Sequence, residues 1–266
     1  MDDGWLIDTD PGLGLPLADV DDALAIVHLV ACGVPVAGLT TIYGNAPLAQ
    51  THRVACDLGR RFGLPVARGA RGPGDEGTEA VERLTAHRGP VLALGPLTNV
   101  AAALRRGATW ERLVVLGGTE RRSPNLWVLH TTELNFALDE AAAADVLPHV
   151  DVLCPMEPCR TVRFGRRDLS GAPSWLRRGC RRWLLTSPLR TGRFAFVPWD
   201  LLPAVYLTHP ELFGVERATA SMAARPLWRG SIATSVTGGD RTAVLRRVDG
   251  PGLHEAWRRT LHRLSS

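Results

Sequence analysis

Short apolar runs alternate with helix-like segments through the first two thirds of the chain. The runs show little alternation of polar and apolar residues, as expected for strands of a parallel sheet that helices cover on both faces. The predicted strands are "GWLID" (4–8), "VAGLTTIY" (36–43), "PVLALG" (90–95), "RLVVLGG" (112–118) and "VDVLCP" (150–155). Between them, the predicted helices are 22–32, 47–62, 97–106 and 139–147.

This order of elements predicts an α/β fold with a mostly parallel, Rossmann-like open sheet, right-handed crossovers and helices on both faces. The Gly-rich stretch 68–80 is expected to be a loop. The last third begins with more helical sequence, becomes strand-like at 217–225 and 242–248, and ends in a predicted helix at 252–264. The chain has no internal repeat and no long linker, so we expect residues 1–266 to form a single domain.

Polar residues follow the predicted strands at their carboxyl ends, which is where ligands bind in open parallel sheets. Asp8 and Asp10 end the first strand, Thr41 and Asn45 end or follow the second, and Thr98 follows "LALGP". The candidate ligand-binding residues should therefore share one edge of the sheet.

Acidic residues are concentrated before the first predicted helix, where five carboxylates lie within fifteen residues: Asp8, Asp10, Asp19, Asp21 and Asp22. Carboxylates held close together repel one another, and either a raised pKa on one of them or a bound cation relieves the repulsion. With several acids present, we favour the cation. An all-oxygen set suits Ca²⁺ or Mg²⁺, and Ca²⁺ tolerates the irregular geometry of a loop. A helix cap explains one acid, Asp19 or Asp21, but not Asp8 and Asp10. We therefore predict a metal site.

The composition excludes several kinds of chemistry. The chain has no lysine, so all 31 basic residues are arginine, which rules out Schiff-base, P-loop and kinase-type lysines. The five cysteines are scattered without a CxxC pair and suggest neither a disulfide framework nor a zinc site. No apolar run approaches the roughly 20 residues that span a bilayer, and the N-terminal "MDDGW" is acidic. We expect a cytoplasmic protein with no membrane partner.

Ten arginines lie between positions 160 and 193, with Asp168 the one acid among them. Such a run can attract phosphate or nucleic acid. No aromatic stacking motif or nucleic-acid module accompanies it, so we favour a solvated helical surface and expect no nucleic-acid partner. The enzyme motifs GxSxG, HExxH, GxxxxGK[ST] and GxGxxG are absent.

The acidic stretch "DTDPG…DVDDALAI" resembles the N-terminal signature DxDPGxDDAxA of the inosine-uridine-preferring nucleoside hydrolase family. Further segments are similar to motifs of that family, occur in the family's order and extend over nearly the whole chain. They are "TTIYGN" (40–45), "LALGPLTNVAAAL" (92–104), "VVLGGT" (114–119), "TELNFALDEAAA" (132–143), "PWDLLPAVYLTHPELF" (198–213) and "RG" (229–230).

The resemblance implies a Ca²⁺-dependent nucleoside N-ribohydrolase that cleaves a ribonucleoside to free base and ribose, as in nucleoside catabolism and salvage. Asp10 would be both a metal ligand and the base that activates metal-bound water. The other implied metal ligands are Asp22, the backbone carbonyl of Thr98, and Asp200. The implied ribose-binding residues are Asp21, Asn45, Asn125, Glu133, Asn135 and Asp200. The resemblance also implies a homo-oligomer, either a dimer or a tetramer.

An acidic pocket suits this reaction, because positive charge develops on the sugar as the N-glycosidic bond breaks. Local sequence leaves other interpretations open. Asn45, Asn125 and Asn135 also fit turns, and Asp200 also fits a helix cap.

Three features depart from the family pattern. Seven extra residues lie between "DPG" and "DD", where Asp19 would be a cap or an outer acid, and the segment usually bearing HGxDG is shortened to "GARGPGDEG". Trp199 stands where many members have a histidine that protonates the leaving base. Tryptophan cannot donate a proton in that way, but it can stack on a base or simply pack in the core. These departures support an alternative function, a non-catalytic relative that binds a metal and a ribosyl ligand.

Overall fold

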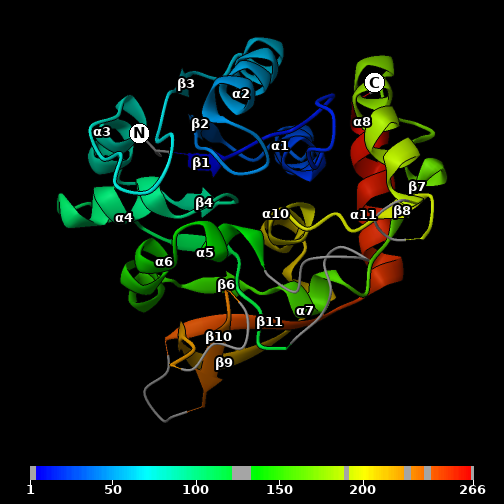
Figure 1. The fold of residues 1–266 in the computed structure, drawn as a ribbon. Helices are drawn as coiled ribbons and strands as arrows, with labels where there is room; N and C mark the ends of the chain where they lie inside the picture. The colour runs from blue at the N-terminus through cyan, green and yellow to red at the C-terminus, as the bar shows by residue number, and fades with distance from the viewer. Residues whose placement is uncertain (1–3, 122–132, 189–191, 225–228, 237–240, 265–266) are drawn as a thin grey trace.

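The computed structural model describes residues 4–121, 133–188, 192–224, 229–236 and 241–264. The strands of its central sheet are β1 (Trp5–Thr9), β2 (Val36–Thr41), β3 (Val66–Ala67), β4 (Val91–Ala93), β5 (Leu113–Leu116), β6 (Val152–Cys154), β9 (Phe213–Met222), β10 (Ile232–Ser235) and β11 (Thr242–Val248). Their order across the sheet is β10-β9-β11-β6-β5-β4-β1-β2-β3 (Figure 1). A separate antiparallel pair consists of β7 (Phe164–Gly165) and β8 (Ala195–Phe196).

Helices connect most of the strands. The α-helices are α1 (Asp21–Ala31), α2 (Leu48–Phe62), α3 (Glu79–Ala86), α4 (Thr98–Arg105), α5 (Leu134–Leu138), α6 (Glu140–Val146), α7 (Met156–Cys159), α8 (Ser174–Thr186), α10 (Leu201–Thr208) and α11 (Gly250–Arg263). The short 3-10 helices are η1 (Leu147–His149), η2 (Arg166–Leu169) and η3 (Pro210–Leu212). Within the described part of the chain, no helix has the length and apolar character needed to cross a membrane.

The sheet is parallel from β3 through β11, and β9 runs antiparallel to both of its neighbours, β11 and β10. β1 lies between β2 and β4, so the connections run outward from β1 in two directions. The predicted α/β fold with a mostly parallel sheet is therefore confirmed. Ligands in such sheets bind beside the strands where the direction of winding changes, here at the carboxyl ends of β1 and β4.

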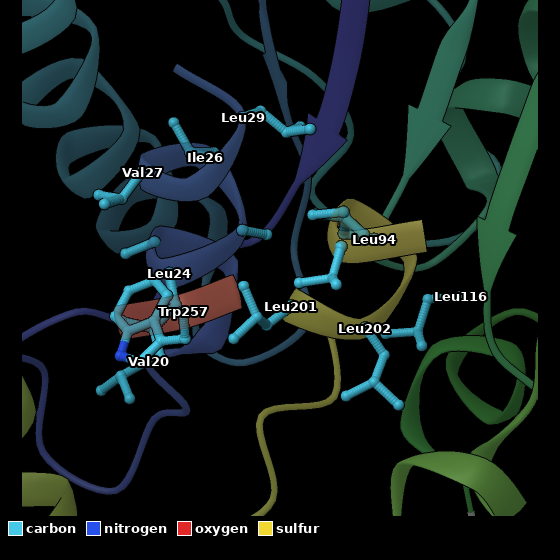
Figure 2. Close-up of a cluster of buried hydrophobic side chains, with 14 of the residues drawn as sticks. Val20, Leu24, Ile26, Val27, Leu29, Leu94, Leu116, Leu201, Leu202 and Trp257 are labelled. Atoms are coloured by element: carbon cyan, nitrogen blue, oxygen red, sulfur yellow. The ribbon is translucent and has the colours of Figure 1, made fainter. Parts of the chain in front are cut away.

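Side chains of the central strands alternate between two apolar layers, one on each face of the sheet. On β1, Ile7 packs in the layer that contains α1, α2, α10 and α11, whereas Leu6 packs in the layer that contains α3, α4 and α6. Figure 2 shows part of the first layer, in which Leu201 and Leu202 of α10 and Trp257 of α11 lie with side chains of α1. Helices therefore cover both faces, and the polar residues are left for the carboxyl ends of the strands.

Most predicted elements are present with small shifts at their ends, but several short ones were not predicted. The Gly-rich loop ends at Thr78, whose hydroxyl accepts a hydrogen bond from the Val81 backbone N–H at 3.3 Å and caps α3. The strands β3 and β10 are short and lie at the two edges of the sheet, where little apolar pattern marks a strand. That the whole chain forms one domain stays a prediction.

Candidate metal site at the carboxyl end of the sheet

Three buried aspartates from two helix N-termini meet beside the end of β1. Asp21 and Asp22 begin α1, and Asp200 occupies the N-cap position of α10. One carboxylate oxygen from each of them lies within 4.8 Å of the others. The two helices are also joined directly, because the Asp200 backbone N–H donates to Asp21 Oδ2 at 3.1 Å. Acids are favoured at helix N-termini, where backbone N–H groups are unpaired, so both helices can present carboxylates to one point.

Asp10 is joined to this group through Asn45. Asp10 Oδ2 accepts the Asn45 backbone N–H at 2.5 Å, and Asn45 Nδ2 donates to Asp22 Oδ2 at 3.1 Å. Asp22 Oδ1 accepts the Asp10 backbone N–H at 3.2 Å and the Thr9 hydroxyl at 2.5 Å. One hydrogen-bond network therefore fixes the predicted ligands Asp10 and Asp22. We call Asp10, Asp21, Asp22 and Asp200 the acidic cluster.

Two glycines allow the backbone to approach Asp10 closely. A Cβ atom on Gly44 would lie 1.9 Å from Asp10 Oδ2, and one on Gly95 would lie 3.0 Å from Asp10 Oδ1. Neither distance leaves normal room for a side chain, so these positions of "TTIYGN" and "LALGP" require glycine.

Burial controls the protonation of the acidic cluster. Loss of hydration raises the pKa of Asp10 and Asp200 well above the ordinary value, and the charges of neighbouring aspartates raise it further. Burial and the charge of Asp21 likewise raise the pKa of Asp22 to about 7. Negative charge is therefore costly here without a compensating cation.

Two oxygen atoms in the cluster are unpaired. Asp21 Oδ1 and Asp200 Oδ1 are buried and accept no hydrogen bond from any described residue. A buried carboxylate oxygen without a partner is unfavourable, and a metal ion removes that penalty. Converging carboxylates with free oxygens are the donor set that hard divalent cations prefer. The described residues therefore fit a hard divalent cation.

A pocket of about 70 Å³ borders the acidic cluster. Its walls consist of Asp19, Asp21, Asn45, Leu94, Leu116, Glu133, Leu134, Asn135, Met156, Trp199 and Asp200. The pocket thus brings together six residues that the sequence predicted to bind substrate, from segments far apart in the chain: Asp21, Asn45, Glu133, Asn135, Trp199 and Asp200. A larger hollow of about 520 Å³ between α2 and α8 contains none of them. The binding roles themselves stay predictions.

Glu133 and Asn135 are held in place at the start of α5. The two carboxylate oxygens of Glu133 accept the backbone N–H groups of Asn135 and Phe136, at 2.6 and 2.7 Å. Asn135 Nδ2 donates to the carbonyls of Leu94 at 2.6 Å and Leu116 at 3.3 Å, and so connects the ends of β4 and β5. Burial raises the pKa of Glu133 to about 7. Both residues therefore help to build the pocket wall that they line.

Two predicted site residues, Thr98 and Asn125, are not among the described residues of the pocket wall. Thr98 does not line the pocket, and its hydroxyl donates to Asp139 Oδ2 at 2.6 Å and contacts the Tyr43 hydroxyl at 3.2 Å. A ligand role for its carbonyl oxygen stays a prediction. Asn125 lies outside the described residues.

The sequence did not identify the apolar walls of the pocket or the position of Asp19. Leu94 and Leu116 end or follow β4 and β5, so the carboxyl-end rule that located the acids could also have located them. Asp19, expected to be a cap or an outer acid, lines the pocket. No sequence pattern predicts that Asp19 lines the pocket, because local sequence does not determine the path of a seven-residue insertion.

Trp199 contacts both the core and the pocket, so its packing role is observed and its stacking role stays a prediction. It is partly buried and packs against the apolar layer around α1 and α10. It also lines the pocket, beside Asp200. An aromatic residue therefore borders the pocket next to the acidic cluster.

Comparisons with known proteins agree with this architecture. A protein-family model described as "Inosine-uridine preferring nucleoside hydrolase" matches residues 5–255. The chain is 33% identical over 181 residues to probable uridine nucleosidase 2 of Oryza sativa subsp. japonica, covering 52% of this chain and 51% of the relative. It is 30% identical over 157 residues to uridine nucleosidase 1 of Arabidopsis thaliana, covering 42% and 44%. The chain spans about half the length of the curated relatives it matches.

Solved structures share the fold over a longer range. A plant nucleoside hydrolase superposes with a TM-score of 0.80 at 20% identity, covering 97% of this chain and 98% of that chain. A purine-preferring ribonucleoside hydrolase from Gardnerella vaginalis superposes with a TM-score of 0.82 at 16% identity, covering 98% of both chains.

Proposed function

Because the chain belongs to the inosine-uridine preferring nucleoside hydrolase family, we propose that it is a Ca²⁺-dependent nucleoside N-ribohydrolase that releases a free base and ribose. The observation that carries this proposal is the buried acidic cluster, whose free oxygens border a pocket with an aromatic wall. Such a site combines a cation-binding set with a surface for a planar base.

We assign the metal to Asp10, Asp22 and Asp200, with the carbonyl of Thr98 as a further ligand. A bound cation would also stabilise the Oδ1 atoms of Asp21 and Asp200, which are buried and accept no hydrogen bond from any described residue. When bound, Ca²⁺ would orient the sugar hydroxyls and make a water molecule more acidic. We propose that side chains of this protein carry out the proton transfer, hold the sugar and stack on the base.

Asp10 is the proposed general base. Its Oδ2 is held by the Asn45 N–H, and its high pKa in the metal-free protein reflects burial and neighbouring acids. In the reaction Asp10 accepts a proton from water, whose oxygen forms the new bond to the sugar carbon. The C–N bond breaks with its electron pair remaining on the base, and the base then takes up a proton.

The other polar groups of the pocket hold the sugar and stabilise its developing positive charge. We propose that Asp21, Asn45 and Asp200 bind sugar hydroxyl groups near the acidic cluster, and that Glu133 and Asn135, which line the same pocket, also bind the sugar. Carboxylates and amide oxygens lower the energy of an oxocarbenium-like transition state. Asn125 is proposed for the same sugar by family likeness alone.

Trp199 is the proposed stacking surface for the base. Its side chain lines the pocket next to Asp200, which fits a base attached to a sugar held by the cluster. No histidine lines the described part of the pocket, so we propose that stacking replaces proton donation by a side chain.

A second candidate function rests on that same observation. A relative that binds the metal and a ribosyl ligand without cleaving it would need neither a proton donor nor a closing loop. Hydrolysis remains the preferred function, because the predicted aspartates are retained: Asp22 and Asp200 converge with Asp21, and the Asp10 backbone N–H donates to Asp22.

The family likeness also supports three proposals about the metabolic role, the cellular location and the oligomeric state of the protein. They are a role in nucleoside catabolism and salvage, a cytoplasmic location, and assembly into a homodimer or homotetramer. Light scattering of the purified protein tests the last, and a monomer at working concentration would contradict it.

The activity is tested by measuring base release from a panel of purine and pyrimidine ribonucleosides. We expect turnover of at least one ribonucleoside by the wild-type protein. Nucleoside binding without base release would instead support the non-catalytic function.

A further inference from the structure

A cation lies against the proposed stacking surface. Arg160 is the C-cap residue of α7, and its guanidinium carbon is 5.9 Å from the centroid of the Trp199 ring. The two segments are in contact, since Cys159 Sγ lies 4.0 Å from the Trp199 carbonyl oxygen. Trp199 lines the pocket, and Arg160 is not among the residues of the pocket wall.

The surroundings of Arg160 strengthen this contact. The side chain is partly buried, and its loss of hydration lowers the pKa of the guanidinium, while the charges of Glu157 and Glu133 oppose that change. An arginine remains a cation even so. A cation that is partly removed from water is attracted to an aromatic face more strongly than an exposed one. Glu157 is itself fixed, because its Oε1 accepts the Thr119 hydroxyl at 2.8 Å.

The proposed reaction needs positive charge on this side of the pocket. When the C–N bond breaks, the base leaves with the bonding electron pair and gains negative charge before it takes up a proton. The histidine that many family members place at this position is replaced by Trp199. A fixed cation close to the ring lowers the energy of that charge without transferring a proton.

We propose that Arg160 is a positioning residue for the departing base, acting through Trp199. It fixes the plane of the indole against which the base stacks, and it places a positive charge close to that plane. The inference rests on the proposed hydrolase activity and identifies the residue that compensates for the missing proton donor.

The test is a series of para-substituted phenyl β-D-ribofuranosides. Their leaving groups share one aromatic ring, but they differ in basicity. Rates would be compared for the wild type, Arg160→Gln and Arg160→Lys. Arg166→Gln is the matched control, because Arg166 is an exposed arginine of the same segment that does not contact Trp199.

Removing the cation should cost most where the leaving group carries most negative charge. We expect Arg160→Gln to lower kcat for the phenyl riboside at least tenfold and for the p-nitrophenyl riboside less than threefold. Arg160→Lys, which keeps the charge but loses the planar group, should fall between Arg160→Gln and the wild type. Arg166→Gln should match the wild type throughout.

The results that would overturn the inference differ from the result that would overturn the proposed function. Equal losses across the series for Arg160→Gln would show a merely structural role and overturn the inference, as would wild-type rates in that variant. If Arg160→Gln does not fold, a steeper dependence on leaving-group basicity in Arg160→Lys supports the inference, and an unchanged dependence overturns it. No hydrolysis of ribosides or nucleosides by the wild type would overturn the proposed function, and the inference with it.

Discussion

Asp8 and Asp10 are separated by one residue, yet their carboxylates face different surroundings. Asp8 Oδ1 accepts the Thr40 hydroxyl at 2.7 Å and Asn99 Nδ2 at 2.9 Å, and so connects β1 to β2 and α4. Asp10 points into the acidic cluster. In a strand, alternate side chains share a face, but Asp10 lies just beyond the end of β1, where the chain leaves the sheet. One acid is therefore structural and the other is proposed to be catalytic.

This difference gives a matched pair of substitutions. Asp10→Asn keeps the shape of the side chain and removes the proposed base, so we expect kcat to fall about 100- to 10,000-fold. Asp8→Asn can still accept both hydrogen bonds through its amide oxygen, and it should keep activity within a few-fold of the wild type. Steady-state hydrolysis and thermal melts of both variants check the pair. Wild-type turnover in Asp10→Asn would remove Asp10 as the base.

The glycine beside Asp10 provides a second test at this scale. Gly44→Ala would force a methyl group against Asp10 Oδ2, so we expect loss of metal binding and a stability loss of about 1–3 kcal/mol. Gly72→Ala is the control, since a Cβ there meets no atom within 4 Å. Calcium titration and chemical denaturation of the two variants give the comparison. Equal behaviour of the two would show that the approach to Asp10 tolerates a side chain.

Three helices that carry the acidic cluster or pack behind it are joined by one buried histidine. His28 of α1 contacts the Thr260 hydroxyl of α11 through Nδ1 and the Thr208 hydroxyl of α10 through Nε2, both at 2.7 Å. Burial, and then the nearby charges of His209 and Arg263, lowers the pKa of His28 to about 3. The neutral ring thus holds α10, which carries Asp200, against α1, which carries Asp21 and Asp22.

This buried histidine predicts a pH dependence of stability. The unfolded chain binds a proton near the ordinary histidine pKa of 6.5, whereas His28 in the folded protein does so only near pH 3. Between these values the unfolded state holds more protons on this histidine, so the His28 contribution to folding stability falls as the pH decreases, by up to about 1.4 kcal/mol per pH unit. The buried acids of the cluster, whose pKa is raised in the folded protein, change the stability in the opposite direction. The stability of His28→Gln relative to the wild type should therefore increase as the pH is lowered from 7 to about 4.5, because the contribution of the buried acids is common to both proteins. His149→Gln, at an exposed position, should follow the wild type across this range, and an unchanged difference between His28→Gln and the wild type would contradict the assignment.

At the level of elements, apolar runs and turn residues were enough to predict the long helices and all the parallel strands except β3. They were not enough for β10 or for α5, because a four-residue edge strand and a five-residue helix depend on tertiary contacts more than on local pattern. The start of α5, for example, is fixed by the Glu133 carboxylate. These missed elements matter for the site, since Glu133 and Asn135 lie at that start.

The candidate site was predictable where residues of known chemistry occur in motifs. Asp10, Asn45 and Asp200 could be selected from their motifs, but only the fold shows that they converge. The apolar lining and Asp19 could not be selected, because they depend on how the insertion between β1 and α1 is folded. Motifs therefore identified the polar groups, and the packing of the elements supplied the pocket.

Across the whole molecule, the acidic cluster lies where β1 and the N-termini of α1 and α10 come together, so its repulsion acts on the core of the fold. A bound cation should therefore stabilise the entire protein. At 100 times its dissociation constant, Ca²⁺ would add about 2.7 kcal/mol to the stability of the folded state, which corresponds to a rise in Tm of roughly 5–10 °C.

The thermal shift is measured on metal-free protein with and without Ca²⁺. Asp22→Asn, which removes one proposed ligand and one negative charge, should melt at or above the temperature of the metal-free wild type and gain little from Ca²⁺. A calcium-induced rise as large as that of the wild type would show that Asp22 does not hold the ion.

The central claim is that this cluster binds a divalent cation on which nucleoside hydrolysis depends. It is tested most directly by following base release from the best ribonucleoside before chelation with EDTA, after it, and after restoring Ca²⁺, with the bound calcium counted in each state. We predict activity that disappears with the metal and returns in proportion to one calcium ion per chain. Full activity in demonstrably metal-free protein would contradict the claim.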